Sequence, residues 1–417
     1  MRIAVIGAGV AGLYAAWHLA QQHRVVLFEQ HGRAGGHTDT HAITSNGRTL
    51  AVDTGFIVFN PERYPLFNAW IDQHGVESRE SVMSFGVSCT KSGLEYNATD
   101  LDSLFCQRSN LIKPGFLRML LDLFRFYRQA PGLLRSLDDG TTLGEWLEDA
   151  GMCREFSEYH LVPMASALWS TPPGQVSDFP MRYLLEFMQN HQMLQAFNRP
   201  IWKTIRGGSR QYVDRVLQSY CGELRVGCRV HQLERHDDHI VLRHEAGEEP
   251  FDQAVLACHA DQALALMSSP SQAEHQVLSA FEYSDNDTVL HTDRSVMPSN
   301  RKAWASWNVR IGSGSGEQQG AISYWMNRLQ GIEDPTPYIV SLNQTSQIDP
   351  ARILKRRQYQ HPLYTRKSRQ AQTRLAEING LDRVWFCGAH WGWGFHEDAV
   401  RSAGQVLTGL EAYARAA

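Results

Sequence analysis

This sequence of 417 residues lacks most features that signal a membrane-spanning, disulfide-stabilised or metal-binding protein. Its seven cysteines are an odd number, and no two of them form a Cys-x-x-Cys pair. The cysteines therefore predict reduced thiols, and they provide neither a metal site nor a disulfide framework. No apolar stretch approaches the roughly 20 residues that a membrane-spanning helix requires.

A strong excess of either charge is also missing. The formal net charge is -4, and 20% of the residues are charged against 43% that are hydrophobic. This balance is typical of a globular protein, and it argues against nucleic acid as a partner. The first apolar run is short and interrupted by glycines, unlike a signal peptide, so we expect a cytoplasmic protein. The length favours two or three domains.

The sequence does contain, directly after its first apolar run, the glycine motif Gly7-x-Gly9-x-x-Gly12. Residues 2–6 predict a buried parallel strand, and the apolar spacing at residues 13–20 predicts a helix. In such a turn Gly7 permits the tight bend, Gly9 lets the backbone approach a pyrophosphate, and Gly12 lets helix and strand pack closely. The helix N-terminus supplies N–H groups for the phosphates.

A second predicted strand, at residues 25–28, is followed by Glu29, which lies 22 residues after Gly7. A carboxylate at this position can accept hydrogen bonds from ribose hydroxyls, and it would repel a 2′-phosphate. The segment therefore predicts a βαβ unit that binds a dinucleotide without the 2′-phosphate of NADP. The alternative is a Rossmann-like turn that binds no nucleotide.

Two more glycine turns follow this strand, Gly35-Gly36 and Asp53-x-Gly55. The first would let backbone amides close over a pyrophosphate. From about residue 67 to residue 199 long helical patterns replace the alternation of strands and helices, which indicates an inserted domain. The earlier alternation resumes at the Gly207-Gly208 turn.

These patterns predict two discontinuous domains. Residues 1–66, 200–282 and 370–417 are expected to form the nucleotide-binding domain, and residues 67–199 and 283–369 the substrate-binding domain. Residues 289–330 indicate a sheet in the latter, with a flexible loop at 312–316. We also expect strands at residues 224–230, 240–243, 254–258 and 383–387, a turn at 245–249, and helices at 212–219 and 397–413.

The segment Phe116–Arg128 combines a narrow polar stripe with a broad apolar face. The polar positions are Arg118, Asp122, Arg125 and Arg128, so the stripe is mostly basic. Such a helix could lie on the inner face of a membrane with its arginines among the headgroups, or line the entrance to an apolar substrate tunnel. It could also be a core helix of the substrate-binding domain with one wet edge.

The last motif is a glycine and aromatic cluster between Gly388 and Asp398, where a strand, a glycine turn and a helix again place a positive helix N-terminus near a ligand. A cofactor that contacts both this cluster and the N-terminal loop must be long, which points to FAD. Trp391, Trp393 and Phe395 are candidates for the walls of a substrate pocket.

His390 and His396 are the groups in this cluster that could exchange a proton near neutral pH. Each interpretation has a structural alternative. The aromatic residues could be core packing, and either histidine could be tied to a backbone carbonyl. Glu397 and Asp398 could simply cap their own helix.

With these motifs the chain resembles the flavin-containing amine oxidase superfamily, which includes protoporphyrinogen oxidases and phytoene-type desaturases. A narrower resemblance, to bacterial FAD-dependent oxidoreductases of which some are tied to methylated, cyclopropane or furan fatty acids, rests on residues 304–308 and 394–398. The broader resemblance is carried by Gly7-x-Gly9-x-x-Gly12, Glu29, Arg33-x-Gly35-Gly36-His37, Asp53-x-Gly55, Gly207-Gly208 and Phe386-x-Gly388 through Ser402.

The resemblance implies an α/β fold, with an FAD-binding Rossmann-like domain of the glutathione reductase type and an inserted α+β substrate domain. His37 stands where family members usually have arginine, so a fixed positive charge at the phosphates is in doubt. The FAD should be non-covalent, because residues 358–373, where covalent amine oxidases present a cysteine, contain none.

The resemblance also assigns roles at the two ends of the cofactor. The backbone at Val230 would hold adenine, and Gly388, Glu397 and Asp398 would meet the ribityl chain and the flavin ring. The full set of implied cofactor-binding residues is Gly7, Gly9, Val10, Ala11, Gly12, Glu29, Gln30, Arg33, Gly35, Gly36, His37, Thr38, Thr54, Gly55, Phe56, Val230, Ala257, Gly388, Glu397 and Asp398.

We therefore predict an enzyme, an FAD-dependent oxidoreductase that oxidises or desaturates a hydrophobic substrate, such as a fatty acyl chain, by hydride transfer to flavin. An amine oxidase is the alternative; such enzymes usually set a lysine beside the flavin, and Lys302 is the only lysine in a suitable stretch. From a different class, the chain could be a non-catalytic, FAD-binding redox sensor. The candidate catalytic residues are His396, His390, Trp391 and Trp393.

Overall fold

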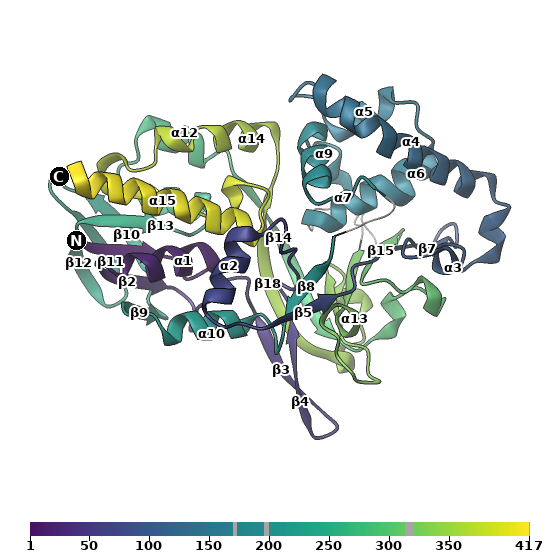
Figure 1. The fold of residues 1–417 in the computed structure, drawn as a ribbon, viewed down its shortest axis with the longest axis horizontal. Helices are drawn as coiled ribbons and strands as arrows, with labels where there is room; N and C mark the ends of the chain where they lie inside the picture. Colours follow the sequence, from purple (N-terminus) through teal and green to yellow (C-terminus); the bar gives the residue numbers. More distant parts are fainter. Residues whose placement is uncertain (170–172, 196–199, 313–320, 417) are drawn as a thin grey trace.

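The computed structural model describes residues 1–169, 173–195, 200–312 and 321–416. A five-stranded parallel sheet forms the first of two large sheets, in the order β19-β13-β1-β2-β9 (Figure 1). The carboxyl ends of its strands lie along one edge, because all of its strand pairs are parallel. The strands are β1 (Arg2–Ile6), β2 (Arg24–Glu29), β9 (Glu223–Val226), β13 (Gln253–Leu256) and β19 (Val384–Phe386).

This sheet is covered on both faces, which explains why its strands read as continuous apolar runs. Ile3 and Val5 pack in one core cluster with helices α1 and α15, whereas Ala4 and Ile6 pack in another with a small antiparallel sheet. The covering elements are α1 (Val10–Leu19), α10 (Arg210–Gln218), α11 (Ala260–Leu266), α12 (Gln272–Leu278), α15 (His396–Ala416), β10 (Val230–Arg235), β11 (Ile240–His244) and β12 (Gly247–Phe251).

The single strand predicted at residues 224–230 is wrong. The chain turns at Gly227, whose φ of +64° is a left-handed conformation that favours glycine. The residues before this turn join the parallel sheet as β9, and β10 begins after it in the antiparallel sheet. The turn predicted at residues 245–249 is also too long, because β12 begins at Gly247.

A seven-stranded sheet forms the second large sheet, in the order β18-β14-β17-β16-β15-β6-β7. Its strand pairs are antiparallel except for β15 with β6. The sheet expected within residues 289–330 is present, although the last five of those residues form helix α13 (Met326–Gln330), and most of the predicted loop at 312–316 lies outside the described residues. The strands are β6 (Phe85–Cys89), β7 (Glu95–Asn97), β14 (Glu282–His291), β15 (Trp307–Ile311), β16 (Ala321–Trp325), β17 (Ile339–Leu342) and β18 (Ile353–Leu363).

A group of helices covers one face of the seven-stranded sheet, in the half of the molecule opposite α1 and α15 (Figure 1). The predicted helix at residues 116–128 lies within the longest of them, α4, which continues to Ser136 despite a proline at 131. The group consists of α3 (Leu101–Leu104), α4 (Pro114–Ser136), α5 (Leu143–Asp149), α6 (Arg154–Phe156), α7 (Val162–Trp169), α8 (Pro173–Val176) and α9 (Met181–Asn190).

The α/β fold predicted from the sequence is confirmed. The division into a nucleotide-binding and a substrate-binding domain at the predicted boundaries stays a prediction. Within the described residues, no helix is both long and apolar enough to cross a bilayer. Shorter elements connect the two halves: α2 (Pro65–Gln73), α14 (Arg366–Thr373), the hairpin β3 (Thr40–Ser45) and β4 (Arg48–Asp53), and the pair β5 (Ser78–Ser81) and β8 (Trp202–Ile205).

Candidate functional site

The candidate site begins where the carboxyl ends of β1, β2 and β13 meet. The N–H of Gly7 donates to the carbonyl of Phe28, and the N–H of Ala257 donates to the carbonyl of Ile6, both at 2.8 Å. Gly7 has a φ of +103°, and a side chain there would lie 2.9 Å from the carbonyl oxygen of Ala257. Ligands of open α/β sheets bind outside this edge.

Gly9 and Gly12, in the loop after β1, have different surroundings. A methyl group at Gly12 would collide with the carbonyl oxygen of Gly7, so close packing of helix and loop requires glycine here. No atom lies within 4 Å of the position that a side chain of Gly9 would take. Gly9 is the N-cap of α1 and provides no side-chain cap, so the first-turn N–H groups of Val10 and Ala11 are available to an anion.

The carboxylate of Glu29 lies beside this loop. Its two oxygens accept hydrogen bonds from the N–H groups of Ala8 (3.0 Å) and His31 (2.9 Å), and only 7% of the residue is exposed. Each oxygen has a further lone pair, so the same carboxylate can also accept a ribose hydroxyl. Of the other residues predicted for this end of the cofactor, Gln30 is exposed and Val230 is buried at the start of β10.

The second glycine turn packs on the first. A side chain at Gly36, whose φ is +56°, would lie 3.1 Å from the Cα of Gly9, and the N–H of Gly35 donates into the same loop (2.7 Å). The guanidinium of Arg33 donates to the carbonyls of Gly36 and Thr38, each at 3.0 Å. Arg33 therefore supports the backbone of this turn.

The turn after β4 completes the glycine-lined edge. A methyl group at Gly55 would collide with the carbonyl of His37, and the N–H of Phe56 donates to that carbonyl (2.9 Å). The hydroxyl of Thr54 lies 2.7 Å from the hydroxyl of Tyr359 on β18. The three glycine turns predicted from the sequence therefore lie against one another.

Asp53 joins a fourth turn to this unit. The residue is fully buried, and its carboxylate accepts hydrogen bonds from the N–H and the hydroxyl of Ser209 (3.0 and 2.8 Å) and from the side-chain amide of Gln330 (2.7 Å). Burial raises the pKa of Asp53 to about 7. Its position explains why the Gly207-Gly208 turn accompanies the other motifs in the sequence.

His37 carries no fixed positive charge to the second turn. Its Nε2 donates to the carbonyl of Gln360 (3.1 Å), and its ring stacks on that of Tyr359, with centroids 5.1 Å apart. Burial, followed by repulsion from His259, lowers the pKa of His37 to about 4. The ring is therefore neutral at physiological pH, in keeping with the absence of the usual arginine.

The C-terminal motif starts at the end of β19. The hydroxyl of Ser402 on α15 accepts a hydrogen bond from the N–H of Gly388 (2.9 Å), which ties the turn to the helix. His390 is buried against Phe281, with ring centroids 5.0 Å apart. Burial, and then the nearby His259, lower the pKa of His390 to about 3, so this histidine is not a proton donor at neutral pH.

His396, the first residue of α15, joins the two ends of the chain. Its ring stacks on Phe56 with centroids 3.5 Å apart, and its Nε2 lies 3.1 Å from the hydroxyl of Tyr212 and 3.3 Å from that of Thr38. Burial and the nearby His37 lower the pKa of His396 to about 3. A neutral ring held by two hydroxyls suits a positioning role better than proton transfer. No sequence motif indicates that Tyr212 belongs to this group.

The carboxylates of Glu397 and Asp398 both bind backbone N–H groups of the protein. Glu397 accepts from the N–H of Phe67 (3.0 Å) at the start of α2. Asp398 accepts a hydrogen bond from the N–H of Phe395 (3.1 Å), and this bond caps the N-terminus of α15. Asp398 also pairs with Arg401 (2.8 Å). Burial raises the pKa of both carboxyls. Both carboxylates therefore have structural partners, and the predicted contact of these two residues with the flavin stays a prediction.

The predicted pocket residues separate into two groups. Trp391 packs on Phe281 (5.0 Å between ring centroids) within the core of the parallel sheet. Trp393 and Phe395 instead pack on helix α9, where the rings of Phe395 and Phe187 stack at 5.1 Å. The rings of Trp393 and Phe395 contact those of three further residues, and we call the five together the aromatic cluster: Trp393, Phe395, Tyr183, Phe187 and His191.

Sequence reasoning missed three members of the aromatic cluster, of which two lie in α9 and the third, His191, directly follows it. A usable signal was present, because Tyr183, Phe187 and His191 are four residues apart and so share one helix face. The indole Nε1 of Trp393 is buried in this cluster and has no hydrogen-bond acceptor within the described part of the chain. A ligand atom is a reasonable partner for such a donor.

A family model described as flavin containing amine oxidoreductase matches residues 10–358 of the chain. The chain belongs to this family. Membership confirms the predicted resemblance to the flavin-containing amine oxidase superfamily. It also confirms that this flavin-containing amine oxidoreductase is an oxidoreductase with FAD as its cofactor. No curated protein sequence matches it.

Solved structures that share the fold of this flavin-containing amine oxidoreductase include enzymes of different substrate class. A fatty acid isomerase from P. acnes that produces CLA is 13% identical with a TM-score of 0.69, and the alignment covers 98% of each chain. Putrescine oxidase bound to putrescine is also 13% identical with a TM-score of 0.69, over 99% of each chain. Cyclohexylamine oxidase from Brevibacterium oxydans is 15% identical with a TM-score of 0.69, over 98% of this chain and 99% of that one.

The residues around the first two turns fit FAD. The open space beside Gly9, the uncapped N-terminus of α1 and the close approach of Gly36 leave room and N–H donors for a pyrophosphate. Glu29 lies at the end of β2, where it can reach the ribose. The contact between His396 and Thr38 brings the C-terminal motif to the same edge, so one extended cofactor can contact both.

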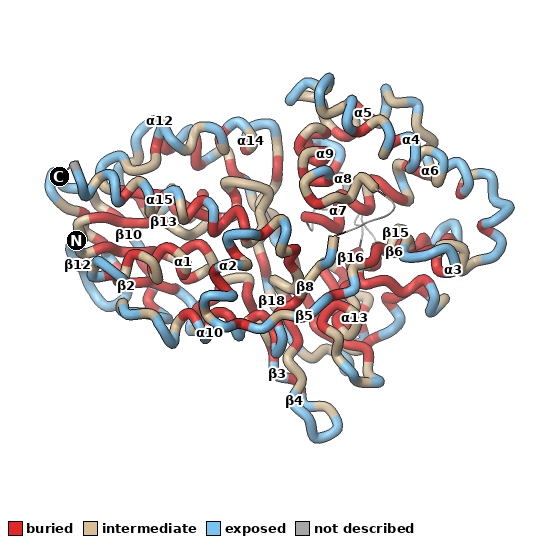
Figure 2. The backbone as a smooth tube through the Cα atoms, viewed as in Figure 1, coloured by how far each residue is buried: buried red, intermediate tan, exposed pale blue. Residues whose placement is uncertain are grey.

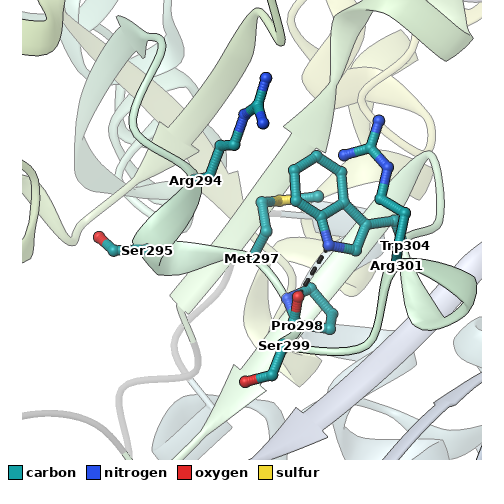
Figure 3. A pocket seen from close by; sticks show the side chains of 7 residues that line it. All are labelled: Arg294, Ser295, Met297, Pro298, Ser299, Arg301 and Trp304. Carbon is teal, nitrogen blue, oxygen red and sulfur yellow. Dashed lines mark hydrogen bonds between the residues drawn. The ribbon is translucent and has the colours of Figure 1, made fainter.

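Lys302 is not at this site. Its ammonium pairs with Asp102 (2.7 Å), and both side chains are 56% exposed. The same region holds a surface pocket of about 590 Å³, framed by Arg294, Arg301 and Trp304 (Figure 3). Trp304 belongs to a core cluster separate from those that contain Trp393 and Phe395. The lysine considered for an amine oxidase is therefore a surface residue.

Proposed function

We propose that this flavin-containing amine oxidoreductase oxidises or desaturates a hydrophobic substrate that carries a carbonyl or carboxyl group, such as a fatty acyl chain. The observation that supports this most is the buried Nε1 of Trp393, which lacks an acceptor among the described residues. A carbonyl oxygen can accept this hydrogen bond, whereas an ammonium group has only donors. An acyl substrate therefore suits the aromatic cluster better than a charged amine.

The absence of charge in the aromatic cluster also favours an apolar substrate. Four of its members are uncharged, and burial lowers the pKa of the fifth, His191, to about 4, so its ring is neutral. Aromatic walls bury large apolar areas and exclude water from an acyl chain. The fatty acid isomerase noted above has the same fold and acts on a fatty acid, which adds weight to this substrate class.

The flavin, when bound, supplies an acceptor for the two electrons and the hydrogen of a C–H bond. The residues of this chain contribute positioning. Trp393 would hold the carbonyl end, and Phe395 and Phe187 would flank the chain. Tyr212 and Thr38 fix the ring of His396 against Phe56. Hydride removal itself requires no histidine. The second hydrogen of the oxidised bond leaves as a proton, which passes to water.

An amine oxidase remains the second candidate. Aromatic rings attract a cation through their faces, so the aromatic cluster could also hold an amine. The putrescine and cyclohexylamine oxidases that share the fold are enzymes of this kind. The surface position of Lys302 weighs against it.

Anaerobic mixing tests the proposal. The purified, FAD-loaded protein is mixed with long-chain fatty acids and their esters, and separately with mono- and diamines, and the visible absorbance of the flavin is followed. Bleaching by acyl compounds alone supports the proposal. Bleaching by amines alone would make the protein an amine oxidase, and bleaching by neither class would favour a non-catalytic redox sensor.

A further inference from the structure

The outward face of α4 carries large apolar side chains that stay exposed in the described structure. Leu117, Leu121 and Phe124 follow one another at helical spacing, and they are 38%, 68% and 57% exposed. Ile112, two residues before the helix, is 81% exposed. Figure 2 shows the corresponding outer turns of α4 on the surface of the helical half of the molecule.

The opposite face of α4 is fixed in the core, so this exposure is not a consequence of a loosely held helix. Met119, Phe126 and Ala130 are almost completely buried and belong to the main hydrophobic cluster of the helical half. The core-helix interpretation with one wet edge therefore describes how α4 packs, and that edge carries large apolar side chains among its arginines.

Positive charge surrounds these exposed side chains. Arg118, Arg125 and Arg128 are all exposed. Among the described residues, Arg118 and Arg128 form no ion pair, and Arg125 reaches Asp122 only at 3.9 Å. Asp122 instead accepts a hydrogen bond from the N–H of Cys153 (2.7 Å). The face is therefore both apolar and basic, and Arg125 is the one of its three arginines that has an acidic partner among the described residues.

We propose that this face, which we call the α4 face (Ile112, Leu117, Leu121 and Phe124 with Arg118, Arg125 and Arg128), docks on the surface of an anionic lipid bilayer. Leucine and phenylalanine side chains enter the boundary between headgroups and acyl chains, and arginines reach the phosphates. A second copy of the chain is a poorer partner. A symmetric dimer through this face would set the three arginines of one copy against those of the other.

The proposal also connects the α4 face to the site, and in this respect it rests on the proposed function. Helix α4 contacts α9, which supplies Tyr183 and Phe187 to the aromatic cluster and is followed directly by His191. Docking through α4 would place this helix pair next to the source of an acyl substrate.

Vesicle flotation tests the docking. The full chain, loaded with FAD, is mixed with vesicles of phosphatidylcholine alone or of phosphatidylcholine and phosphatidylglycerol. We expect flotation with the anionic vesicles that decreases with added salt. The double variant Leu121→Glu, Phe124→Glu should float at least about tenfold less. The matched control is Val82→Glu, Leu381→Glu, which changes two exposed apolar side chains elsewhere (49% and 48%) and should float like the parent.

A second variant keeps the test valid if the first folds poorly. Arg118→Gln, Arg125→Gln, Arg128→Gln retains the apolar residues and should bind anionic vesicles roughly 100-fold more weakly, with little change on neutral ones. Absence of flotation by the parent protein, or flotation of both variants equal to the parent, would overturn the proposal. A dimer in light scattering that the Leu121 and Phe124 changes dissociate, without vesicle binding, would assign the face to a second copy. Flotation needs no turnover, so its failure is distinct from a failure of flavin bleaching.

Discussion

At the scale of single residues, Gly9 and Gly12 give opposite expectations for the same change. Gly9→Ala should leave the stability of the flavin-free protein unchanged, because the methyl group enters open space, but it should weaken FAD binding by occupying room beside the pyrophosphate. Gly12→Ala should lower the free energy of unfolding by about 2–3 kcal/mol, because the methyl group meets the carbonyl of Gly7. Thermal unfolding without flavin and flavin retention after gel filtration measure the two effects. Equal destabilisation by both changes would contradict this assignment.

Glu29 is expected to serve both the loop and the cofactor. Glu29→Ala removes two hydrogen bonds to backbone N–H groups and a ribose partner, so the affinity for FAD should decrease by roughly 10- to 100-fold. Glu29→Gln keeps one acceptor oxygen and should lose less. Titration of the flavin-free protein with FAD, followed by fluorescence, gives the dissociation constants. Unchanged affinity in the alanine variant would show that the ribose lies elsewhere.

Trp393 and Trp391 offer a matched pair for the proposed substrate contact. Both indole Nε1 groups are buried without an acceptor among the described residues, but only Trp393 belongs to the aromatic cluster. Trp393→Phe should lower kcat/KM for an acyl substrate by roughly three- to tenfold through the lost hydrogen bond. Trp391→Phe should leave kcat/KM nearly unchanged. Steady-state kinetics with both variants decide the matter, and equal losses would remove the proposed role of Trp393.

Prediction of single residues succeeded at positions where the backbone geometry allows only one residue type. A glycine that must lie against a carbonyl, as at Gly12 or Gly55, is visible in the spacing of a motif. A carboxylate can bind many partners, and the sequence cannot choose among them. The pattern predicts Glu397 as a flavin contact, but it does not predict that the side chain of Glu397 also binds the start of α2.

At the scale of elements, Glu397 links α15 to α2. Its oxygens accept from the N–H groups of Leu66 (3.3 Å) and Phe67 (3.0 Å), which belong to the first turn of α2. Glu397→Ala should therefore lower the free energy of unfolding by about 1–2 kcal/mol. FAD affinity should decrease little, because the hydrogen bonds of this carboxylate tie α15 to α2. Urea unfolding and FAD titration of the same variant separate the two roles, and a large loss of affinity with unchanged stability would restore the predicted flavin contact.

Element-level prediction depended on how local the determining contacts are. The order β1, α1, β2 was correct because strand, glycine turn and helix are adjacent in sequence. The segment around α4 was correctly predicted as a helix. The sequence left open what its outward face contacts, since apolar residues occupy both sides of the helix. The strand predicted at 224–230 was wrong because one glycine, Gly227, divides two strands of different sheets.

At the scale of the whole molecule, the sheets draw on distant segments. The parallel pair of β6 and β15 joins residues near 87 with residues near 309, and no local pattern specifies this pairing. The candidate site also combines distant segments, because the side chain of His396 contacts that of Thr38, 358 residues earlier in the sequence. Family-like motifs at both ends predicted that these segments meet. They did not predict the helices that cover the aromatic cluster.

The buried histidines of the whole molecule should make its stability depend on pH. Burial lowers their pKa to about 3 or 4 in the folded protein, below the usual value of 6.5, so the unfolded chain binds more protons between pH 6.5 and about 4. The contribution of these histidines to the free energy of unfolding is therefore fully present above pH 6.5, and it decreases as the pH falls from 6.5 to about 4. Asp53, whose pKa is raised to about 7, binds a proton more readily in the folded protein, so it offsets a part of this loss of stability. The histidines concerned are His37, His191, His259, His291, His361, His390 and His396.

His361 shows how the neutral form is enforced. The N–H of Asp287 donates to Asn343, Asn343 donates to Asn286, and the amide of Asn286 donates to Nδ1 of His361 (2.9 Å). This chain of donors requires an unprotonated Nδ1, in agreement with the lowered pKa of His361 of about 3.

Lowering the pH from 7 to 5 should decrease the free energy of unfolding, by at most about 2 kcal/mol for a single histidine of this group. His361→Gln keeps an acceptor for Asn286 but cannot titrate, so the variant should lose less stability over this range than the parent. Urea unfolding of the FAD-loaded protein at a series of pH values measures both slopes. A parent protein that becomes more stable between pH 7 and pH 5 would contradict the neutral, buried state of these rings, and equal slopes in parent and variant would place the proton uptake at other groups.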